Sequence, residues 1–206
     1  IYDLVLLPDD NSYEFDKVKK SKQIINNPNE KIIIDKNSTI FLKIGNNVKE
    51  LDVILEDSNS SRLVVHGLIP PDIKISVRSD PLRSQKVERM DQNSLTGCIT
   101  FLDSYIKNID IFIKDAQCED AVNFIRSKGK INNIEIYNSK SDAIDMDFSD
   151  LNINSIKIDR AGNDCVDVSF GKYIFKKIDL NKCGDKGVSV GEISNVKIIY
   201  SSISNS

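Results

Sequence analysis

The sequence predicts an all-β fold, a right-handed parallel β-helix with about 22 residues in each coil. One observation is the composition, which is rich in Ile, Val, Asn, Asp and Ser, poor in Ala and lacking Trp, so strand and turn formers outnumber helix formers. A second is that four consecutive segments share one pattern, beginning at Glu119, Ser141, Asn163 and Gly184. A third is that each segment holds two short strands and no helix.

Each of the four segments has a polar turn, a small residue and then an alternating strand. The turn aspartates Asp120, Asp142, Asp164 and Asp185 recur at a nearly constant interval of one repeat. The alternating strands after them are Val122-Asn123-Phe124, Ile144-Asp145-Met146, Val166-Asp167-Val168 and Val188-Ser189-Val190. A second alternating strand follows about a dozen residues later, as in Ile156-Lys157-Ile158. Period-two alternation indicates one buried face, so strands one repeat apart are expected to stack in parallel.

A repeat of this length excludes the other parallel architectures. A β-α-β crossover needs a dozen or more connecting residues, most often a helix, for which the segments have no room. Leucine-rich repeats have a similar length, but their Leu-x-Leu framework and asparagine ladder are absent from the sequence. The parallel architecture that is left is a coil of short strands, in which each coil lies on the previous one about 4.8 Å away.

The pattern predicts a single β-helix domain over residues 31–206. Earlier coils are expected at KIIIDKNSTIFLKIG, LDVILEDSNSSRLVVHG and TGCITFLDSYIKNIDIFIKD, and the charged segment near 79–96 is expected to project as a loop. Residues 1–30 form a cap region in this prediction. Within it, DKVKKSKQIINN has two apolar pairs at helical spacing and predicts a short amphipathic helix that closes the open end of the stack.

Charge, hydropathy and cysteine spacing restrict the function. A net charge of −3, with no basic stripe in the sequence, disfavours nucleic-acid binding, and no apolar run is long enough to span a membrane. The four cysteines Cys98, Cys118, Cys165 and Cys183 lack the paired spacing of a zinc site, and His66 is the only histidine. We therefore predict free cysteines in or near the core and no bound transition metal.

Stacking turns sequence positions into columns of side chains. The mid-strand column holds Asn123, Asp145, Asp167 and Ser189, and the turn column holds the four aspartates, with Arg126 and Lys186 nearby. If both columns share one surface, carboxylates on adjacent coils repel one another, and a cation such as Ca²⁺, the basic neighbours or a shared proton must offset this. The alternative is that the turn aspartates only cap turns through bonds to the backbone.

Three motifs resemble the polygalacturonases, the β-helical pectin hydrolases. These are SDAIDMD at 141–147, NDCVDVS at 163–169 and GDKGVSVGE at 184–192, in the order and at the approximate spacing of that family. The resemblance implies that Asp142 and Asp164 help to activate the attacking water. It also places Asn163 where the family has its general acid and Lys186 where it has histidine, and the family's Arg-x-Lys clamp is missing.

The same motifs resemble β-helix repeats of uncharacterised bacterial surface and polysaccharide-locus proteins, which implies an extracellular, cell-surface or periplasmic setting. We therefore expect a protein that binds or processes a polysaccharide. Asp142, Asp164 and Lys186 are the candidate catalytic residues, with Lys186 also a candidate base for β-elimination. Asn123, Arg126, Asp145, Asp167 and Ser189 are the candidate substrate-binding residues. The alternative is a non-catalytic β-helix module of a larger surface protein, favoured by the strand-like end NVKIIYSSISNS and implying further domains as partners.

Overall fold

The structure, a computed structural model, describes residues 19–57, 60–79, 89–91 and 93–206. All of its regular elements are strands, which confirms the predicted all-β fold. They are β1 (Lys19–Ile25), β2 (Asn29–Ile34), β3 (Ser38–Ile44), β4 (Glu50–Leu55), β5 (Arg62–Ile69), β6 (Lys74–Ser79), β7 (Gly97–Ala116), β8 (Asp120–Ile125), β9 (Lys128–Ser139), β10 (Asp142–Asp147), β11 (Asp150–Ala161), β12 (Val166–Ser169), β13 (Lys172–Cys183), β14 (Val188–Val190) and β15 (Asn195–Ser204).

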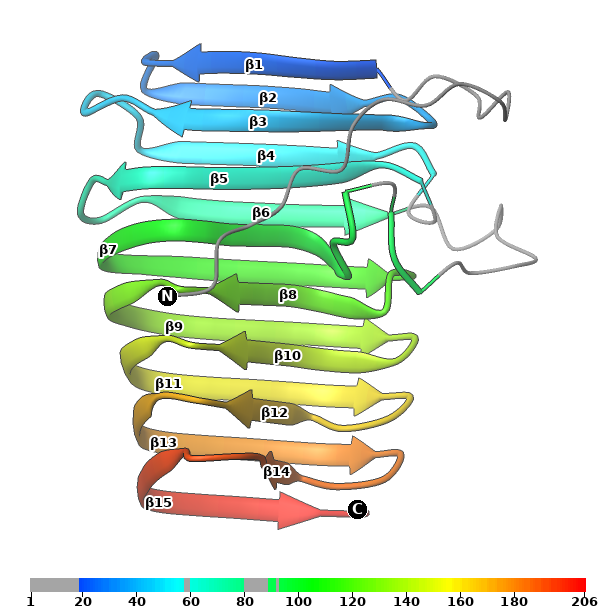
Figure 1. Ribbon diagram of the computed structural model, residues 1–206, viewed down its shortest axis with the longest axis vertical. Coiled ribbons are helices and arrows are strands. Elements are labelled where there is room, and N and C mark those ends of the chain that lie inside the picture. The colour runs from blue at the N-terminus through cyan, green and yellow to red at the C-terminus, as the bar shows by residue number, and fades with distance from the viewer. Residues whose placement is uncertain (1–18, 58–59, 80–88, 92) are drawn as a thin grey trace.

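The strands stack in parallel as a β-helix of about seven turns (Figure 1). One column of strands runs β1, β3, β5, β7, β8, β10, β12 and β14, and the other runs β2, β4, β6, β7, β9, β11, β13 and β15. Register follows the sequence repeat, since Asp145 pairs with Asp167 and Ile156 with Ile178, in each case one repeat further along the chain. The inward-facing residues are apolar, and Phe101 stacks on Phe124 with ring centroids 5.0 Å apart. Burial of these columns is the main stabilising term.

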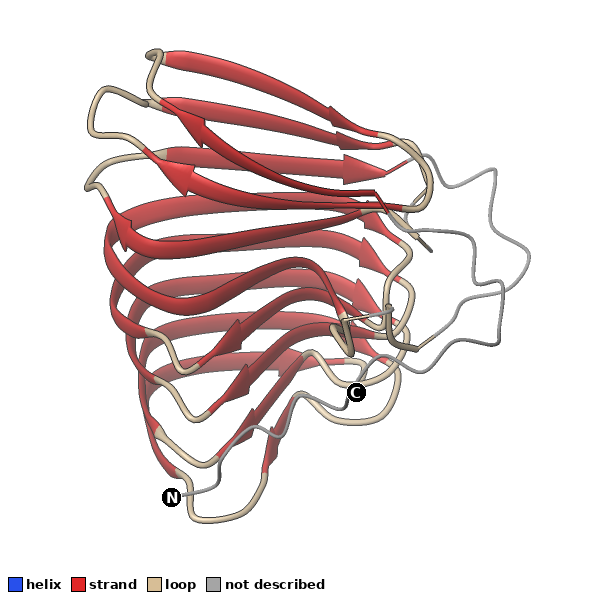
Figure 2. Cartoon of the chain, turned by 45° about the horizontal axis from the view of Figure 1, so that its top comes forward, coloured by secondary structure: helices blue, strands red, loops and turns tan. Residues whose placement is uncertain are grey.

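β9, β11 and β13 each bend once, which gives their coils three sides rather than two (Figure 2). In β11 the buried residues Ile153 and Ile156 are separated by two outward positions, Asn154 and Ser155, and Asn154 has no partner in the strand register. The amide of Asn154 donates instead to the Oδ1 of Asn132 one coil before, at 3.2 Å. The bend separates the outer surface of β9, β11 and β13 into two faces.

Stacked serines lie just after the corner where the coil leaves its short strand. Ser127 donates its backbone N–H to the Oγ of Ser149 (2.9 Å), and the Oγ of Ser127 donates to the carbonyl of Phe101 (2.9 Å). In the next coil Gly171 takes the serine position, and the buried Tyr173 supplies the hydroxyl. Its Oη accepts the Ser149 N–H at 3.4 Å and lies 2.9 Å from the carbonyl of Met146. Burial raises the pKa of Tyr173 to about 12, so the hydroxyl keeps its proton.

Tyr173→Phe is expected to destabilise the protein by about 1–3 kcal/mol, because it leaves buried backbone groups of Ser149 and Met146 without their partner. Chemical denaturation measures the change in the free energy of unfolding. Tyr200→Phe is the matched control, since Tyr200 is 71% exposed on β15 and its hydroxyl has no comparable burial. An equal effect of the two substitutions would contradict the structural role of the Tyr173 hydroxyl.

The predicted helix in the cap region is wrong where the structure describes it. Residues 19–25 form β1, which pairs in parallel with β3, so the coils begin before residue 31. Backbone pairing with β3 satisfies donors and acceptors that an isolated short helix leaves to water. Residues 16–18 of the predicted helix lie outside the described residues, as do 80–88 and 92 of the predicted loop near 79–96. The described residues form no helix, so none of them belongs to a helix long and apolar enough to cross a membrane.

The prediction of free cysteines is also wrong. Cys98 is bonded to Cys118, and Cys165 to Cys183, with Cα atoms 5.4 and 5.3 Å apart. Each disulfide joins the start of a coil to the end of the same coil, because separations of 20 and 18 residues are slightly shorter than one repeat. In the coil directly before the Cys165–Cys183 bond, Ala143 and Ala161 occupy the positions equivalent to these two cysteines.

Candidate functional site

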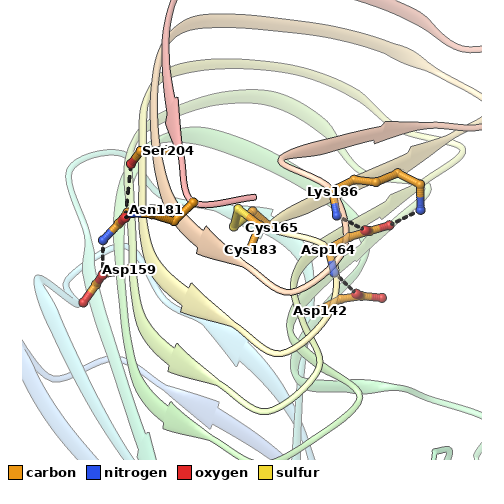
Figure 3. Close-up of a disulfide and its surroundings, with 9 residues drawn as sticks. Asp142, Asp159, Asp164, Cys165, Asn181, Cys183, Lys186 and Ser204 are labelled. Carbon is orange, nitrogen blue, oxygen red and sulfur yellow. Dashed lines mark hydrogen bonds and ion pairs between the residues drawn. A yellow bond between two sulfur atoms is a disulfide. The ribbon is translucent and has the colours of Figure 1, made fainter.

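The turn column connects successive coils through its carboxylates (Figure 3). The Oδ1 of Asp142 accepts the backbone N–H of Asp164 at 2.8 Å, and it also accepts the side-chain amide of Asn163 at 2.8 Å. One coil later the Oδ1 of Asp164 accepts the backbone N–H of Lys186 at 2.9 Å. Two of the three catalytic candidates from the sequence, Asp142 and Asp164, thus join successive coils through hydrogen bonds to backbone N–H groups, and Asp164 is only 4% exposed.

Lys186, rather than Asp185, continues this column. The backbone N–H of Asp185 donates to the carbonyl of Asn163, so Asp185 is equivalent to Asn163 and Lys186 to Asp164. The sequence prediction aligned Asp185 because the last repeat is one residue shorter when counted from aspartate to aspartate. The Nζ of Lys186 forms ion pairs with Asp185 and, at 3.6 Å, with the Oδ2 of Asp164. The hydrogen bond to Asp185 is the main cause that raises the pKa of Lys186.

The mid-strand column forms the expected ladder, but exposure changes along it. Register pairs Asn123 with Asp145, Asp145 with Asp167, and Asp167 with Ser189. Asn123 is buried, whereas the other three are partly exposed. The amide of Asn123 donates to the Oδ2 of Asp145 at 2.6 Å and to the Oδ2 of Asp120 at 3.3 Å. Asn123 therefore connects the mid-strand column to the turn column.

Burial and crowding make two of these carboxyls weak acids. Burial, opposed by the hydrogen bonds of Thr96 and Asn123, raises the pKa of Asp120 to about 7. Burial and the negative charges of neighbouring aspartates raise the pKa of Asp145 to about 9. Burial also raises the pKa values of Asp142 and Asp147. At neutral pH the Asp145 carboxyl thus carries a proton that relieves the repulsion.

Arg126 lies at the corner after β8 and is already paired. Its Nε and Nη2 donate to the two carboxylate oxygens of Asp103 at 2.7 and 2.8 Å. This bidentate bond lowers the pKa of Asp103 and raises that of Arg126. The guanidinium of Arg126 is therefore already neutralised by Asp103. Arg126 lies beside the ladder of Asn123, Asp145, Asp167 and Ser189 and is not part of it.

Two phenylalanines at the border of the ladder were not among the candidates from the sequence. Phe148 and Phe170 directly follow β10 and β12, and their rings stack with centroids 4.8 Å apart. Their side chains are 56% and 37% exposed. Both have positive φ, 51° and 49°, which is unfavourable for a bulky residue. Their separation by one repeat, in DFS and SFG, was the available signal.

We call this surface the aspartate–phenylalanine face. It comprises the outward residues of β10, β12 and β14 and the stacked rings at their ends: Asp145, Asp147, Asp167, Ser169, Ser189, Phe148 and Phe170. Asp147 was also missed by the sequence reasoning, although it lies two residues from Asp145 and on the same side of β10. In the part of the chain that the structure describes, no three His, Cys, Asp or Glu side chains are grouped to hold a metal ion.

Carboxyls, hydroxyls and aromatic rings thus recur on successive coils of this face. Comparisons with protein-family models, with curated proteins and with solved structures found no match to this chain.

Proposed function

We propose that this protein is a non-catalytic polysaccharide-binding β-helix, whose aspartate–phenylalanine face holds a neutral, hydroxyl-rich glycan along the coil axis. The observation that carries the proposal is the exposed, stacked Phe148–Phe170 pair beside the partly exposed ladder of Asp145, Asp167 and Ser189. Aromatic rings pack against the apolar faces of sugars, and carboxyl and hydroxyl groups bond their hydroxyls. Their positive φ is shared by Asp103, Arg126 and Ile193 at the equivalent corners of other coils, so it belongs to the turn and the exposed rings carry the argument.

Binding is favoured over hydrolysis because the residues that the polygalacturonase resemblance assigns to catalysis are engaged elsewhere. Asp142 and Asp164 accept backbone N–H groups of the next coil. Asn163, at the position of the general acid, carries an amide with no acidic proton to give a leaving group. In our proposal the likeness to pectin hydrolases extends to shape and not to reaction.

We further propose an extracellular, cell-surface or periplasmic location. Two disulfides in one small domain are rare in reducing compartments and common in oxidising ones. Polysaccharides of cell envelopes and matrices lie in the same compartments, so the location and the proposed ligand agree.

The test is binding to neutral oligosaccharides of increasing length, measured by calorimetry with and without Ca²⁺. Phe148→Ala with Phe170→Ala is expected to weaken binding at least about tenfold, or roughly 1.4 kcal/mol. Alanine keeps a β-carbon at both positions, so the backbone strain is unchanged and only the rings are lost. Affinity is expected to rise with oligosaccharide length until the ligand spans the stacked coils.

The matched control is Phe112→Ala with Tyr137→Ala, which removes a second aromatic pair, with centroids 5.6 Å apart, from a different face. Equal binding by both double variants would contradict the proposed face. No binding of any neutral glycan would favour the alternative, a structural module in which Asp142 and Asp164 serve only to join coils. New reducing ends or unsaturated products would show that the protein is an enzyme and contradict the non-catalytic proposal.

A further inference from the structure

A groove of about 550 Å³ lies on another side of the β-helix, on the outer surface of β7, β9, β11 and β13. Its walls come from four successive coils and include Tyr105, Lys107, Lys130, Asn152, Lys172 and Ile174. Register arranges the surface in two columns. One holds Tyr105, Lys128, Asp150 and Lys172, and the other holds Lys107, Lys130, Asn152 and Ile174. We call this surface the lysine groove.

The groove gathers positive charge although the whole chain is acidic. Lys107, Lys128, Lys130 and Lys172 all have exposed side chains. None of the four forms an ion pair with a residue in the described ranges, in contrast to Lys186 with its two aspartates. Asp150 is the one carboxylate that lines the groove. Exposed cations without partners are available for a negatively charged ligand.

The groove also offers apolar surface between its cations. Tyr105 is 54% exposed, and the Nζ of Lys107 lies 5.9 Å from its ring centroid. Ile174 is 38% exposed at the other end. Between them is Gly129, whose φ is +129°, and a β-carbon there would collide with the carbonyl of Ile106. The backbones of these coils therefore approach closely, and the floor carries no side chain at this point.

We propose that the lysine groove binds an anionic polysaccharide whose sugars carry carboxylate or sulfate groups. Lys107 and Lys130 lie on neighbouring coils about 4.8 Å apart, and Lys172 lies two coils beyond Lys130, so cations are spaced along the groove at intervals of one and two coils. The ammonium groups pair with the acidic substituents, while Tyr105 and Ile174 contact the apolar faces of the rings. The site is separate from the aspartate–phenylalanine face, whose negative charge repels such a ligand, and it stands whether or not that face binds a neutral glycan.

A single-stranded nucleic acid fits the groove less well. Sequence-independent binding of that kind uses several aromatic side chains on which successive bases stack. The groove has one aromatic side chain among its lining residues, Tyr105, and the carboxylate of Asp150 lies among its cations. Sugars need no such row of rings, so the single tyrosine and the spaced lysines favour an acidic glycan.

The experiment measures binding of three octasaccharides by calorimetry in dilute buffer and at 0.5 M NaCl: a uronate, a sulfated glycosaminoglycan and a neutral glucan. We expect the wild-type protein to bind one or both anionic probes and to release them at high salt, as screened ion pairs do. The two anionic probes show whether carboxylate or sulfate is preferred. Lys130→Glu with Lys172→Glu is expected to weaken this binding more than tenfold.

Lys31→Glu with Lys43→Glu is the matched control, since both lysines are exposed on earlier coils and the charge change is the same. Asp150→Asn is expected to strengthen binding several-fold, because it removes the carboxylate from the groove. The proposal is overturned if the groove and control variants lose affinity equally, if the neutral octasaccharide binds as well as the anionic ones, or if a single-stranded oligonucleotide binds the groove more tightly than they do.

Discussion

Asp145→Asn is expected to stabilise the protein by several kcal/mol, up to about 6, at pH 8.5 and by about 1 kcal/mol at pH 4.5. The pKa of Asp145 is raised to about 9 by burial and by the charges of neighbouring aspartates. In the unfolded chain the same carboxyl ionises near its ordinary pKa of about 3.9. Below pH 4 this carboxyl is protonated in both states and costs the fold no stability. As pH rises from there toward the folded pKa, ionisation favours the unfolded chain, and the free energy of unfolding decreases. The uncharged amide removes this loss and still accepts the hydrogen bond of Asn123.

Chemical denaturation at the two pH values measures the effect. Glu56→Gln is the control, because Glu56 is exposed in the turn after β4 and neutralising it is expected to change stability equally little at both pH values. If Asp145→Asn stabilises the protein equally at both pH values, ionisation of the Asp145 carboxyl is not the cause of the effect. A loss of stability at pH 8.5 would contradict the placement of a protonated carboxyl in the ladder.

Cys165→Ala with Cys183→Ala is expected to destabilise the protein by about 3 kcal/mol. The bond closes a loop across 18 residues, and removing it gives the unfolded chain more conformations. Alanine is expected to pack without strain at both positions, because the preceding coil already has Ala143 and Ala161 at the equivalent positions. The decrease in stability of this variant therefore reports the loss of the disulfide and not a change in core packing. Thermal denaturation in oxidising buffer measures the decrease in Tm.

The reverse change provides the control for geometry. Ala143→Cys with Ala161→Cys is expected to form a third disulfide, which thiol titration of the denatured protein would detect as the absence of new free thiols. Addition of reductant is expected to lower the Tm of the wild type more than that of the Cys165→Ala, Cys183→Ala variant. If reductant lowers both equally, the Cys165–Cys183 bond does not contribute as described.

Much of the fold follows from the sequence because the repeat is local and regular. Alternation around Asp145 and Asp167, which lie one repeat apart, predicted parallel strands in register, and both pair as expected. The helix predicted before residue 31 failed because an apolar pattern over so few residues is compatible with both periods, and pairing with β3 decided it. The disulfides were missed because cysteine spacing was compared with metal motifs and not with the length of one coil.

The candidate site was predicted less completely than the fold. The ladder and its crowding were expected, but the role of each carboxyl depends on partners that the sequence does not place side by side. Asp142 and Asp164 bind backbone N–H groups of residues one coil further on. Lys186 took the position expected for Asp185 because the backbone bond from Asp185 to Asn163 sets the register. Phe148 and Phe170 became notable only once their exposure and stacking were seen.

By itself the sequence determined the stacking, since alternation within strands and a regular repeat between them leave one way to bury the apolar residues. Only the tertiary structure decided which surface the charges occupy. Lysines as far apart as Lys107 and Lys172 follow no single repeat position, yet coiling brings them to one groove. The pKa of a carboxyl such as Asp145 likewise depends on neighbours from adjacent coils. The physical reason is that apolar burial follows local periodicity, whereas electrostatic interactions depend on distances that only the folded coils establish.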